Sequence, residues 1–217
     1  NTSSSVFVIN DRPDNTDQII KYDSSGNASQ VIDTGMYLGG IAVTDAYNDP
    51  WYNVNAVFVI NDRPYNTDRI IWYDSSGNVS KIIDTDRYLS GIAVSDSKEI
   101  FVISDRPNNT DQIIRYNYAS IPMLPGGAST ANVSQVIDTG MYLSGIAATD
   151  SNEILVINDR PDNLTDQIIR YTSGGTVSEV IDTGMFLGGI AVSDSNQVFA
   201  INDDRPSNTD RIIWYDD

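Results

Sequence analysis

The sequence predicts an all-β fold of repeated four-stranded units, and two observations support this prediction. The segment 6–22 returns in similar form at 57–73, 100–116, 155–171 and 199–215. Its short runs are rich in Val, Ile, Tyr and Phe, are separated by turns such as Ser75-Ser76-Gly77-Asn78, and carry no useful helical stripe. Units of four strands that repeat every 40 to 50 residues or so are typical of β-propeller blades. Five units therefore predict a single five-bladed β-propeller.

The Asp before each Arg-Pro pair marks the repeat, at Asp11, Asp62, Asp105, Asp159 and Asp204. The spacings are 51, 43, 54 and 45 residues, so a base unit of about 43 residues is lengthened chiefly by inserts at 46–55 and 118–131. We expect one domain over 1–217, with repeat units 6–56, 57–99, 100–153, 154–197 and a partial unit 198–217. Strands two and three occur five times but strands one and four only four times, which predicts incomplete first and last blades.

The second unit and the start of the third illustrate the predicted strands, which are 70–73, 81–83, 91–94 and 100–103. In 57–60 both alternating sets of side chains are apolar. This pattern predicts a strand that is buried on both faces, as a sheet packed between two neighbouring sheets requires.

Composition and charge exclude several classes of function. Apolar residues make up 40% of the chain, a globular value, and 13 basic against 30 acidic residues give a net charge of −17. This acidic field repels phosphates, so nucleic acid is not an expected partner. There is no apolar run long enough for membrane insertion. The absence of His and Cys excludes zinc sites, His-based acid–base catalysis and thiol chemistry.

Three motifs resemble the NHL-type repeat: Gly-Ile-Ala-Val-Ser-Asp at 91–96, Ile-Phe-Val-Ile-Ser-Asp at 100–105 and Asn-Thr-Asp-Gln-Ile-Ile-Arg-Tyr at 109–116. The resemblance spans nearly the whole chain and implies a propeller whose two-to-three and four-to-one loops share one face. Enzymes of similar fold depend on His or zinc, or on a central Glu among Asp and Asn ligands. This chain has only Glu99, Glu153 and Glu179. Its Asp residues recur at equivalent positions, so we expect no catalytic residue and no cofactor.

A repeated loop, Asp-Arg-Pro-x-Asn-Thr-Asp, supplies the main candidate site. One interpretation is a ring of pockets for a polyol, a sugar or a calcium ion. The other is a structural turn, in which Pro fixes φ, Asn or Asp caps the backbone, and Arg pairs with Asp, including the Asp-Thr turns at Asp33, Asp84, Asp138 and Asp182. The Arg in every repeat would offset a metal's charge, which favours the structural interpretation and predicts no metal. The loop residues are Asp11, Arg12, Asp17, Asp62, Arg63, Asp68, Asp105, Arg106, Asp111, Asp159, Arg160, Asp166, Asp204, Arg205 and Asp210.

The inserts and the glycosylation motifs are candidate sites for contact with a partner and for modification. The apolar content of the inserts indicates either a partner surface or local packing, and it resides in Tyr47, Trp51, Tyr52, Ile121, Met123 and Leu124. Asn-x-Ser/Thr motifs predict an extracellular or cell-surface glycoprotein, and they occur at Asn1, Asn27, Asn78, Asn108, Asn132 and Asn163.

These features predict a non-enzymatic, extracellular structural propeller that self-associates. The strand edges at 212–215 and 6–9 differ, so their pairing is head-to-tail and builds filaments. The alternatives are a multivalent glycan-binding lectin and a protein-binding adaptor that uses the inserts. A lectin needs an exposed aromatic at one position in every blade. We expect the residues at that position to be buried instead, and they are Tyr37, Tyr88, Tyr142 and Phe186.

A further aromatic position lies on the third strand. Trp72 and Trp214 stand there in place of Lys21, Arg115 and Arg170. Exchange between tryptophan and basic residues predicts a partly exposed position.

Overall fold

The structure, a computed structural model, describes residues 5–13, 16–49, 52–64, 66–95, 97, 99–106, 110–117, 128–130, 132–161, 165–193, 195–203 and 210–215. Every regular element in these ranges is a β-strand, and they contain no helix that is long and apolar enough to cross a membrane. The strands are β1 (Val6–Asn10), β2 (Asp17–Tyr22), β3 (Ala28–Asp49), β4 (Tyr52–Asp62), β5 (Arg69–Tyr73), β6 (Val79–Asp84), β7 (Tyr88–Val94), β8 (Glu99–Asp105), β9 (Gln112–Asn117), β10 (Ala128–Thr130), β11 (Val133–Asp138), β12 (Leu143–Ala148), β13 (Ile154–Asn158), β14 (Asp166–Tyr171), β15 (Val177–Met185), β16 (Leu187–Val192), β17 (Val198–Asn202) and β18 (Arg211–Tyr215).

The described strands form four sheets, whereas the sequence predicted five blades. Two sheets are four-stranded, with the orders β11-β9-β8-β7 and β12-β13-β14-β15, and β16-β17-β18 form the three-stranded sheet predicted for the last repeat. The remaining sheet has seven strands in the order β1-β2-β3-β4-β5-β6-β10. The prediction of five separate blades is therefore wrong at the level of hydrogen-bonded sheets.

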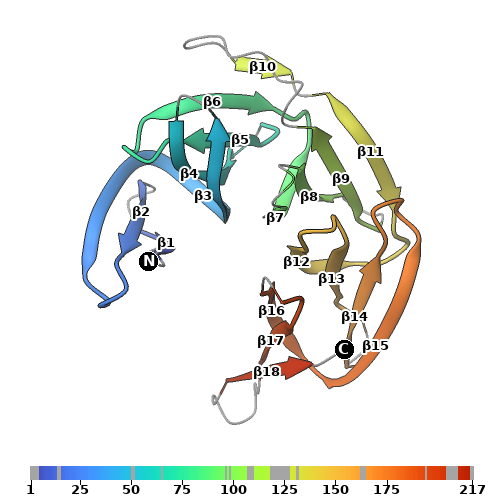
Figure 1. The fold of residues 1–217 in the computed structure, drawn as a ribbon. Helices are drawn as coiled ribbons and strands as arrows, with labels where there is room; N and C mark the ends of the chain where they lie inside the picture. Colours follow the sequence, from blue (N-terminus) through green and yellow to red (C-terminus); the bar gives the residue numbers. More distant parts are fainter. Residues whose placement is uncertain are drawn as a thin grey trace. The chain divides into compact units, whose positions relative to one another are not determined.

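The cause is β3, which runs without a break from its pairing with β2 of the first repeat to its pairing with β4 of the second (Figure 1). Its first part pairs with β2 up to Met36, and from Tyr37 onward it pairs with β4. Gly35, with a φ of 65°, lies where the partner changes, and the bend there does not interrupt the strand. β10, in the second insert, was not predicted and pairs in parallel with β6.

By its internal packing the chain divides into two units. One comprises residues 1–89 and 122–130, and the other comprises residues 90–121 and 131–217. The single domain expected from the sequence stays a prediction.

The first unit has its core between the first two repeats. Strands two and three of each repeat present a front face, typified by Val57 and Ile71, and a back face, typified by Ile60 and Ile70. The front of the second repeat packs on Ile19 and other back-face residues of the first in one buried cluster. Residues 57–60 are all buried, which confirms the prediction of a strand covered on both faces.

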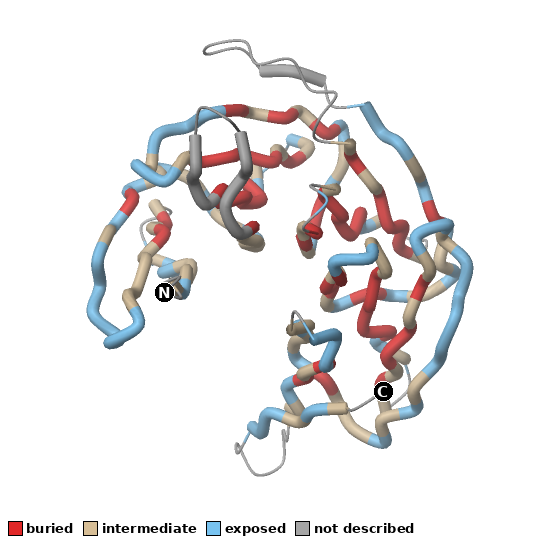
Figure 2. The backbone as a smooth tube through the Cα atoms, viewed as in Figure 1, coloured by how far each residue is buried: buried red, intermediate tan, exposed pale blue. Residues whose placement is uncertain are grey.

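The second unit repeats this packing twice. Back-face Phe101 and Ile113 of the third repeat pack with front-face Ile154 and Val156 of the fourth. Back-face residues of the fourth repeat pack in turn with front-face residues of the fifth, including Val198. Figure 2 shows the result, because β13 and β14 are mostly buried while the edge strand β15 is mostly exposed.

Adjacent sheets of this unit approach so closely that glycine is needed between them. A Cβ on Gly91 would lie 3.0 Å from Ile103 Cδ1 of its own sheet and 3.1 Å from Ile146 Cγ2 of the next. Gly145 has the same environment one repeat later, beside Ile157 and Ile190. The glycine of the Gly-Ile-Ala motif is therefore a packing residue.

A core substitution tests this arrangement. Ile168→Ala removes a fully buried back-face side chain, and we expect the free energy of unfolding to fall by about 2–5 kcal/mol. Val180→Ala, on the exposed side of the neighbouring strand β15, should change it by less than about 0.5 kcal/mol. Urea unfolding of both variants provides the comparison, and equal losses would contradict the packing described.

Candidate functional site

In the first four repeats the last Asp of the loop is buried, and it bonds to the strand that pairs with the following repeat. Asp17 accepts hydrogen bonds from the backbone N–H of Arg12 (3.0 Å), in its own loop, and of Leu38 (2.8 Å), in the part of β3 that pairs with β4 of the next repeat. Asp68 accepts from Arg63 (3.1 Å) and Leu89 (2.7 Å) in the same way. The bonds to the strand that pairs with the next repeat recur at 2.8 Å and 2.6 Å in the pairs Asp111–Leu143 and Asp166–Leu187.

A threonine adds a second link at each of these positions. The Thr34 hydroxyl donates to the Asp17 carbonyl at 2.5 Å. Equivalent bonds of 2.6 Å come from Thr85, Thr139 and Thr183. The two-to-three loop and the Asp-Thr turn are thereby held together, as the shared face expected from the sequence requires.

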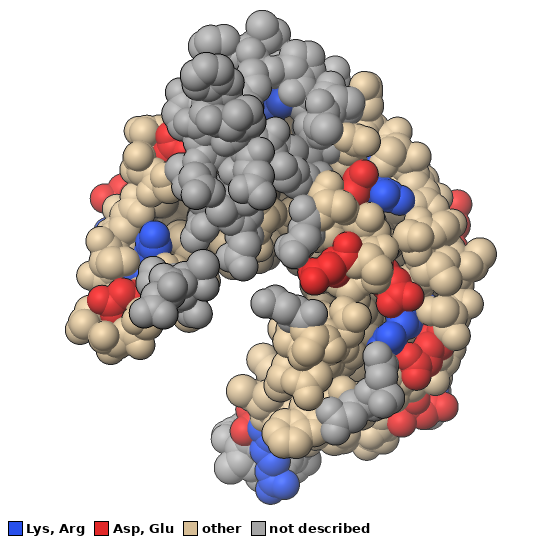
Figure 3. Space-filling view, viewed as in Figure 1, with Lys and Arg blue, Asp and Glu red and all other residues tan. Residues whose placement is uncertain are grey.

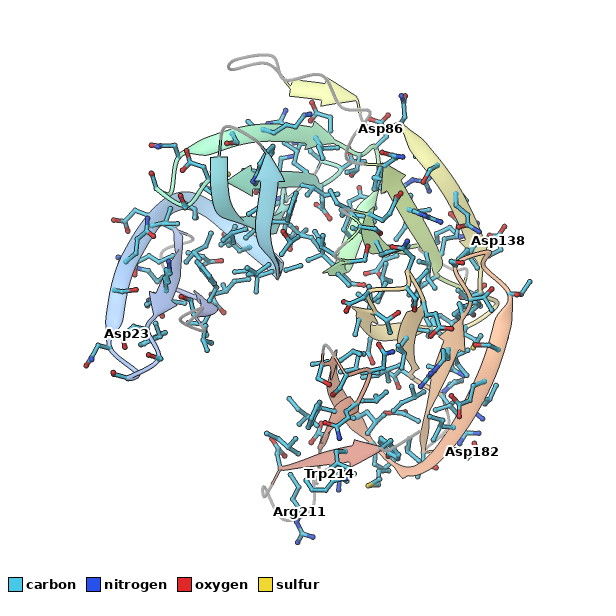
Figure 4. All side chains as sticks on the ribbon, viewed as in Figure 1. Asp23, Asp86, Asp138, Asp182, Arg211 and Trp214 are labelled. Carbon is cyan, nitrogen blue, oxygen red and sulfur yellow. The ribbon has the colours of Figure 1, made fainter. Side chains whose placement is uncertain are left out.

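The loop arginines face the Asp-Thr turns of their own repeats. The distances are 3.7 Å for Arg12–Asp33, 3.8 Å for Arg63–Asp84, 3.4 Å for Arg106–Asp138 and 3.7 Å for Arg160–Asp182. The guanidinium groups of Arg63, Arg106 and Arg160 also donate to carbonyls within their loops. Asp138 ends β11 and Asp182 lies on β15 (Figure 4). Because these pairs are partly exposed, each contributes at most about 1 kcal/mol.

Little of the loop is left over for a ligand or metal. Among the described residues no group of three or more acidic side chains is placed to hold a metal ion. Asp11, Asp62, Asp105, Asp159 and Asp210 are exposed, while Asp204 and Arg205 lie outside the described residues. On the face shown in Figure 3, acidic side chains are spread over the surface and several adjoin basic ones.

Burial shifts the titration of two of the joining carboxyls. Desolvation raises the pKa of Asp68 and of Asp166, and hydrogen bonds from Leu89 and Leu187 oppose that rise. Asp23, in an exposed turn, behaves oppositely, because hydrogen bonds led by the one from Asn27 lower its pKa.

The aromatic series is where the structure most changes the sequence interpretation. Tyr37, Tyr88 and Tyr142 are 36%, 49% and 50% exposed, and Phe186 is half-buried. The expectation that these rings are buried is therefore wrong for the three tyrosines. Tyr37 lies opposite Asp62 in the strand register. Tyr142 and Phe186 accept backbone hydrogen bonds, both 2.8 Å long, from Asp159 and Asp203.

Small residues follow the aromatic position at a fixed distance along the chain. Gly39 and Gly188 lie two residues after Tyr37 and Phe186, with Asp62 Cβ and Asp203 Cβ 3.9 Å from a Cβ built on each. Ser90, two residues after Tyr88, donates to Asp105 of the third repeat at 2.7 Å. The backbones of an aromatic and an acidic residue are thus neighbours in the pairs Tyr37–Asp62, Tyr142–Asp159 and Phe186–Asp203.

The other candidates are only partly covered. In the first insert, Tyr47 pairs with Val54 and Tyr52 with Asp49, so the backbone there forms an extension of the β3–β4 hairpin. Trp51, Ile121, Met123 and Leu124 lie outside the described residues. Of the glycosylation motifs, Asn27, Asn78 and Asn132 are exposed, and Asn1, Asn108 and Asn163 lie outside the described residues.

The two tryptophans of the third-strand position differ from one another. Trp72 is 5% exposed, whereas Trp214 is 66% exposed. The expectation of partial exposure is therefore wrong for Trp72.

Sequence reasoning missed some contacts between repeats. Arg115 reaches the Ser173 carbonyl (3.2 Å), and Asn152 accepts from Ser95 (2.6 Å) in the preceding repeat. Glu99 and Glu153 form ion pairs with Arg115 and Arg170 at 3.1 Å and 3.9 Å. The signal for these pairs was the recurrence of Glu before strand two together with Arg on strand three.

Comparison with known proteins addresses the fold alone. No protein-family model and no curated protein matches the chain. Among solved structures, the WD40 β-propeller domain of Doa1 matches over 97% of this chain and 61% of that chain, with a TM-score of 0.59 and 12% identity. The fold is a β-propeller. The comparison does not test whether the repeats are of the NHL type, which stays a prediction.

Two other propeller-fold structures are similar to this chain. TolB from Acinetobacter baumannii has a TM-score of 0.65 and 16% identity over 98% of this chain. The PQQ-bound aldose sugar dehydrogenase from Streptomyces coelicolor has a TM-score of 0.61 and 12% identity, covering 98% of this chain and 75% of that one. The chain spans only 50% of the TolB chain.

The raised pKa of Asp68 gives a pH-dependent prediction. A carboxyl whose folded-state pKa is raised contributes stability at low pH, and that contribution is lost as pH rises through the folded-state value. The free energy of unfolding of the native protein, minus that of Asp68→Asn, should therefore decrease as the pH rises from about 3 to about 7.

Asp23→Asn is the matched control, because the lowered pKa of Asp23 gives the opposite slope. Urea unfolding across the pH range measures both slopes. Slopes of the same sign would contradict the different environments described for the two carboxyls.

Proposed function

We propose that this chain is a non-enzymatic binding propeller that recognises basic segments of a partner protein. One observation carries the proposal: Tyr37, Tyr88 and Tyr142 are exposed at the same position of successive repeats. An acidic residue stands at the end of the strand two that comes next in the sequence after each tyrosine, and these residues are Asp62, Asp105 and Asp159. Similar positions repeated at a fixed spacing suit a multivalent surface.

The chemistry of the position favours a cationic group. The face of a tyrosine ring attracts Lys and Arg, and a neighbouring carboxylate strengthens that attraction. The loop arginines lie within 4 Å of the Asp-Thr turns of their own repeats, and the Asp residues at the starts of these loops are exposed. A net charge of −17 adds a long-range attraction for basic partners.

Three further elements of the proposal have sequence support. The chain is not an enzyme, because its Asp residues are equivalent from repeat to repeat and His is absent. It acts outside the cell or at the cell surface as a glycoprotein, and three of its glycosylation motifs lie at exposed positions. A change of intact mass on peptide N-glycosidase treatment of naturally produced protein supports that location, and an unchanged mass argues against it.

Self-assembly into head-to-tail filaments is the second candidate function. Its support is a different observation, namely the apolar side chains that β17 and β18 leave exposed. Calcium is not part of either candidate, because no described acidic cluster favours it.

Replacing the aromatic series tests the binding proposal. The triple variant Tyr37→Ala, Tyr88→Ala, Tyr142→Ala should bind a lysine oligomer at least tenfold more weakly than the native chain, because three cation–π contacts of roughly 0.5–1 kcal/mol each are lost. Isothermal titration calorimetry measures the affinity, and native binding should weaken as salt increases.

The matched control is Val31→Ala, Val79→Ala, Val136→Ala, three equally exposed side chains on outer strands. It keeps the charge unchanged and should retain native affinity. Equal affinity of both triple variants would reduce the binding to bulk charge and contradict the proposal. Salt-insensitive binding on a glycan array, lost in the tyrosine variant, would establish the lectin alternative in its place.

A further inference from the structure

An extra strand lies along the outer edge of the second repeat. β10, in the second insert, pairs in parallel with β6, with Ala128 opposite Ile82 and Thr130 opposite Asp84. Without β10, β6 would be the last strand of its sheet, and Figure 1 shows the two strands side by side. The outer edge of a repeat in this chain therefore accepts a further strand in parallel.

The equivalent strand of the fourth repeat, β15, has an open outer edge. Its segment Val180–Asp182 corresponds in sequence to Ile82–Asp84 of β6. Among the described strands β15 ends its sheet, in the order β12-β13-β14-β15. The outer side of such a strand presents a row of backbone N–H and C=O groups that is ready for pairing.

The length of β15 favours pairing there over pairing at β11, the other outer strand of the same unit. β15 has nine residues, whereas β11 has six. β15 also contains neither Lys nor Pro, the residue types with which edge strands discourage pairing. In addition, β15 carries Glu179 where β11 has the uncharged Gln135.

Two valines supply an apolar surface beside this edge. Val177 and Val180 lie opposite Tyr171 and Ile169 in the strand register, so both belong to the front face. They are 51% and 50% exposed. A neighbouring strand with an apolar side chain next to Val180 would remove part of this surface from water.

Two carboxylates give the same edge a negative charge. The side chains of Glu179 and Asp182 are 45% and 71% exposed. Arg170 lies 3.1 Å from Glu179 and Arg160 lies 3.7 Å from Asp182, and Asp182 also accepts a hydrogen bond from Gln167. Because both carboxylates keep much of their surface in solvent, they remain accessible to basic side chains on an added strand.

We propose that the outer edge of β15 binds an extended basic segment of a partner protein, which joins the sheet as a parallel strand. In the register of β10 on β6, a Lys-Val-Ile-Lys segment places its Val and Ile beside Val180 and Ile181. Its two Lys then lie beside Glu179 and Asp182. Backbone hydrogen bonds provide affinity, and the side-chain pairs provide selectivity.

This site goes beyond the binding proposed for the tyrosine series. It uses the backbone of an outer strand and needs no cation–π contact, so either site can fail without the other. A partner that carries several basic segments would engage both.

Peptides with methylated backbone nitrogens test the strand addition. The probe is fluorescein-labelled Ser-Lys-Val-Ile-Lys-Ser, and fluorescence anisotropy measures its affinity for the native chain. Alternate residues of a strand direct their N–H groups to the same edge. Methylation at the first Lys and Ile, or at Val and the second Lys, therefore blocks opposite edges of the peptide. We expect the two methylated peptides to differ in affinity by about tenfold or more. Equal affinities, or no binding of the unmodified probe, would overturn the proposal.

Matched variants of the protein test the location. Val180→Lys and Val136→Lys introduce the same charge at equivalent exposed positions of β15 and β11. Val180→Lys should weaken binding of the probe by about tenfold or more, because a lysine at the edge opposes pairing and repels the peptide. Val136→Lys should leave the affinity within about twofold of the native value. Equal losses in the two variants would overturn the assignment to β15.

The triple tyrosine variant separates this site from the proposed function. It should bind the probe as the native chain does. Binding that is lost in the tyrosine variant but retained in Val180→Lys would overturn the edge site while supporting recognition by the tyrosines.

Discussion

The two-sided apolar character of the strands is the constraint on which the rest of the structure depends. Residues such as Val57, Phe58, Val59 and Ile60 fill both faces of their sheet, so one sheet alone would expose a full apolar face to water. Each repeat is therefore stabilised by its neighbours, as in other repeat proteins. Glycines such as Gly91 set how closely the neighbours approach.

The repeated polar loop serves the same packing. Asp17, Asp68, Asp111 and Asp166 each bond to the backbone of a strand that pairs with the next repeat, and the loop arginines pair with the Asp-Thr turns. A motif this regular suggested a ring of ligand pockets, but its side chains largely bind one another. The chemistry left for a partner lies in the exposed tyrosines Tyr37, Tyr88 and Tyr142.

Much of the fold followed from the sequence, because period-two apolar runs and turn residues act locally. The predicted strands 70–73, 81–83, 91–94 and 100–103 lie within β5, β6, β7 and β8. The continuity of β3 had no local signal, since the sequence of its Asp-Thr-Gly segment resembles a turn between two strands. Tyr88 was misplaced because β7 begins three residues earlier than predicted, which puts the ring inside the strand and opposite in direction to buried Leu89. The exposure of β18 was equally unpredictable, because burial depends on the neighbouring sheet and β5 has the same sequence.

Native-state hydrogen exchange, read strand by strand, tests the dependence of each repeat on its neighbours most directly. Strands covered on both faces, such as β8 and β13, should exchange only through global unfolding, with protection equal to the free energy of unfolding. β1 and β18, which carry the exposed side chains Val6 and Ile212, should exchange through local opening and be less protected. Uniform protection from β1 to β18 would contradict the account, because it would mean that covering the second face adds no stability.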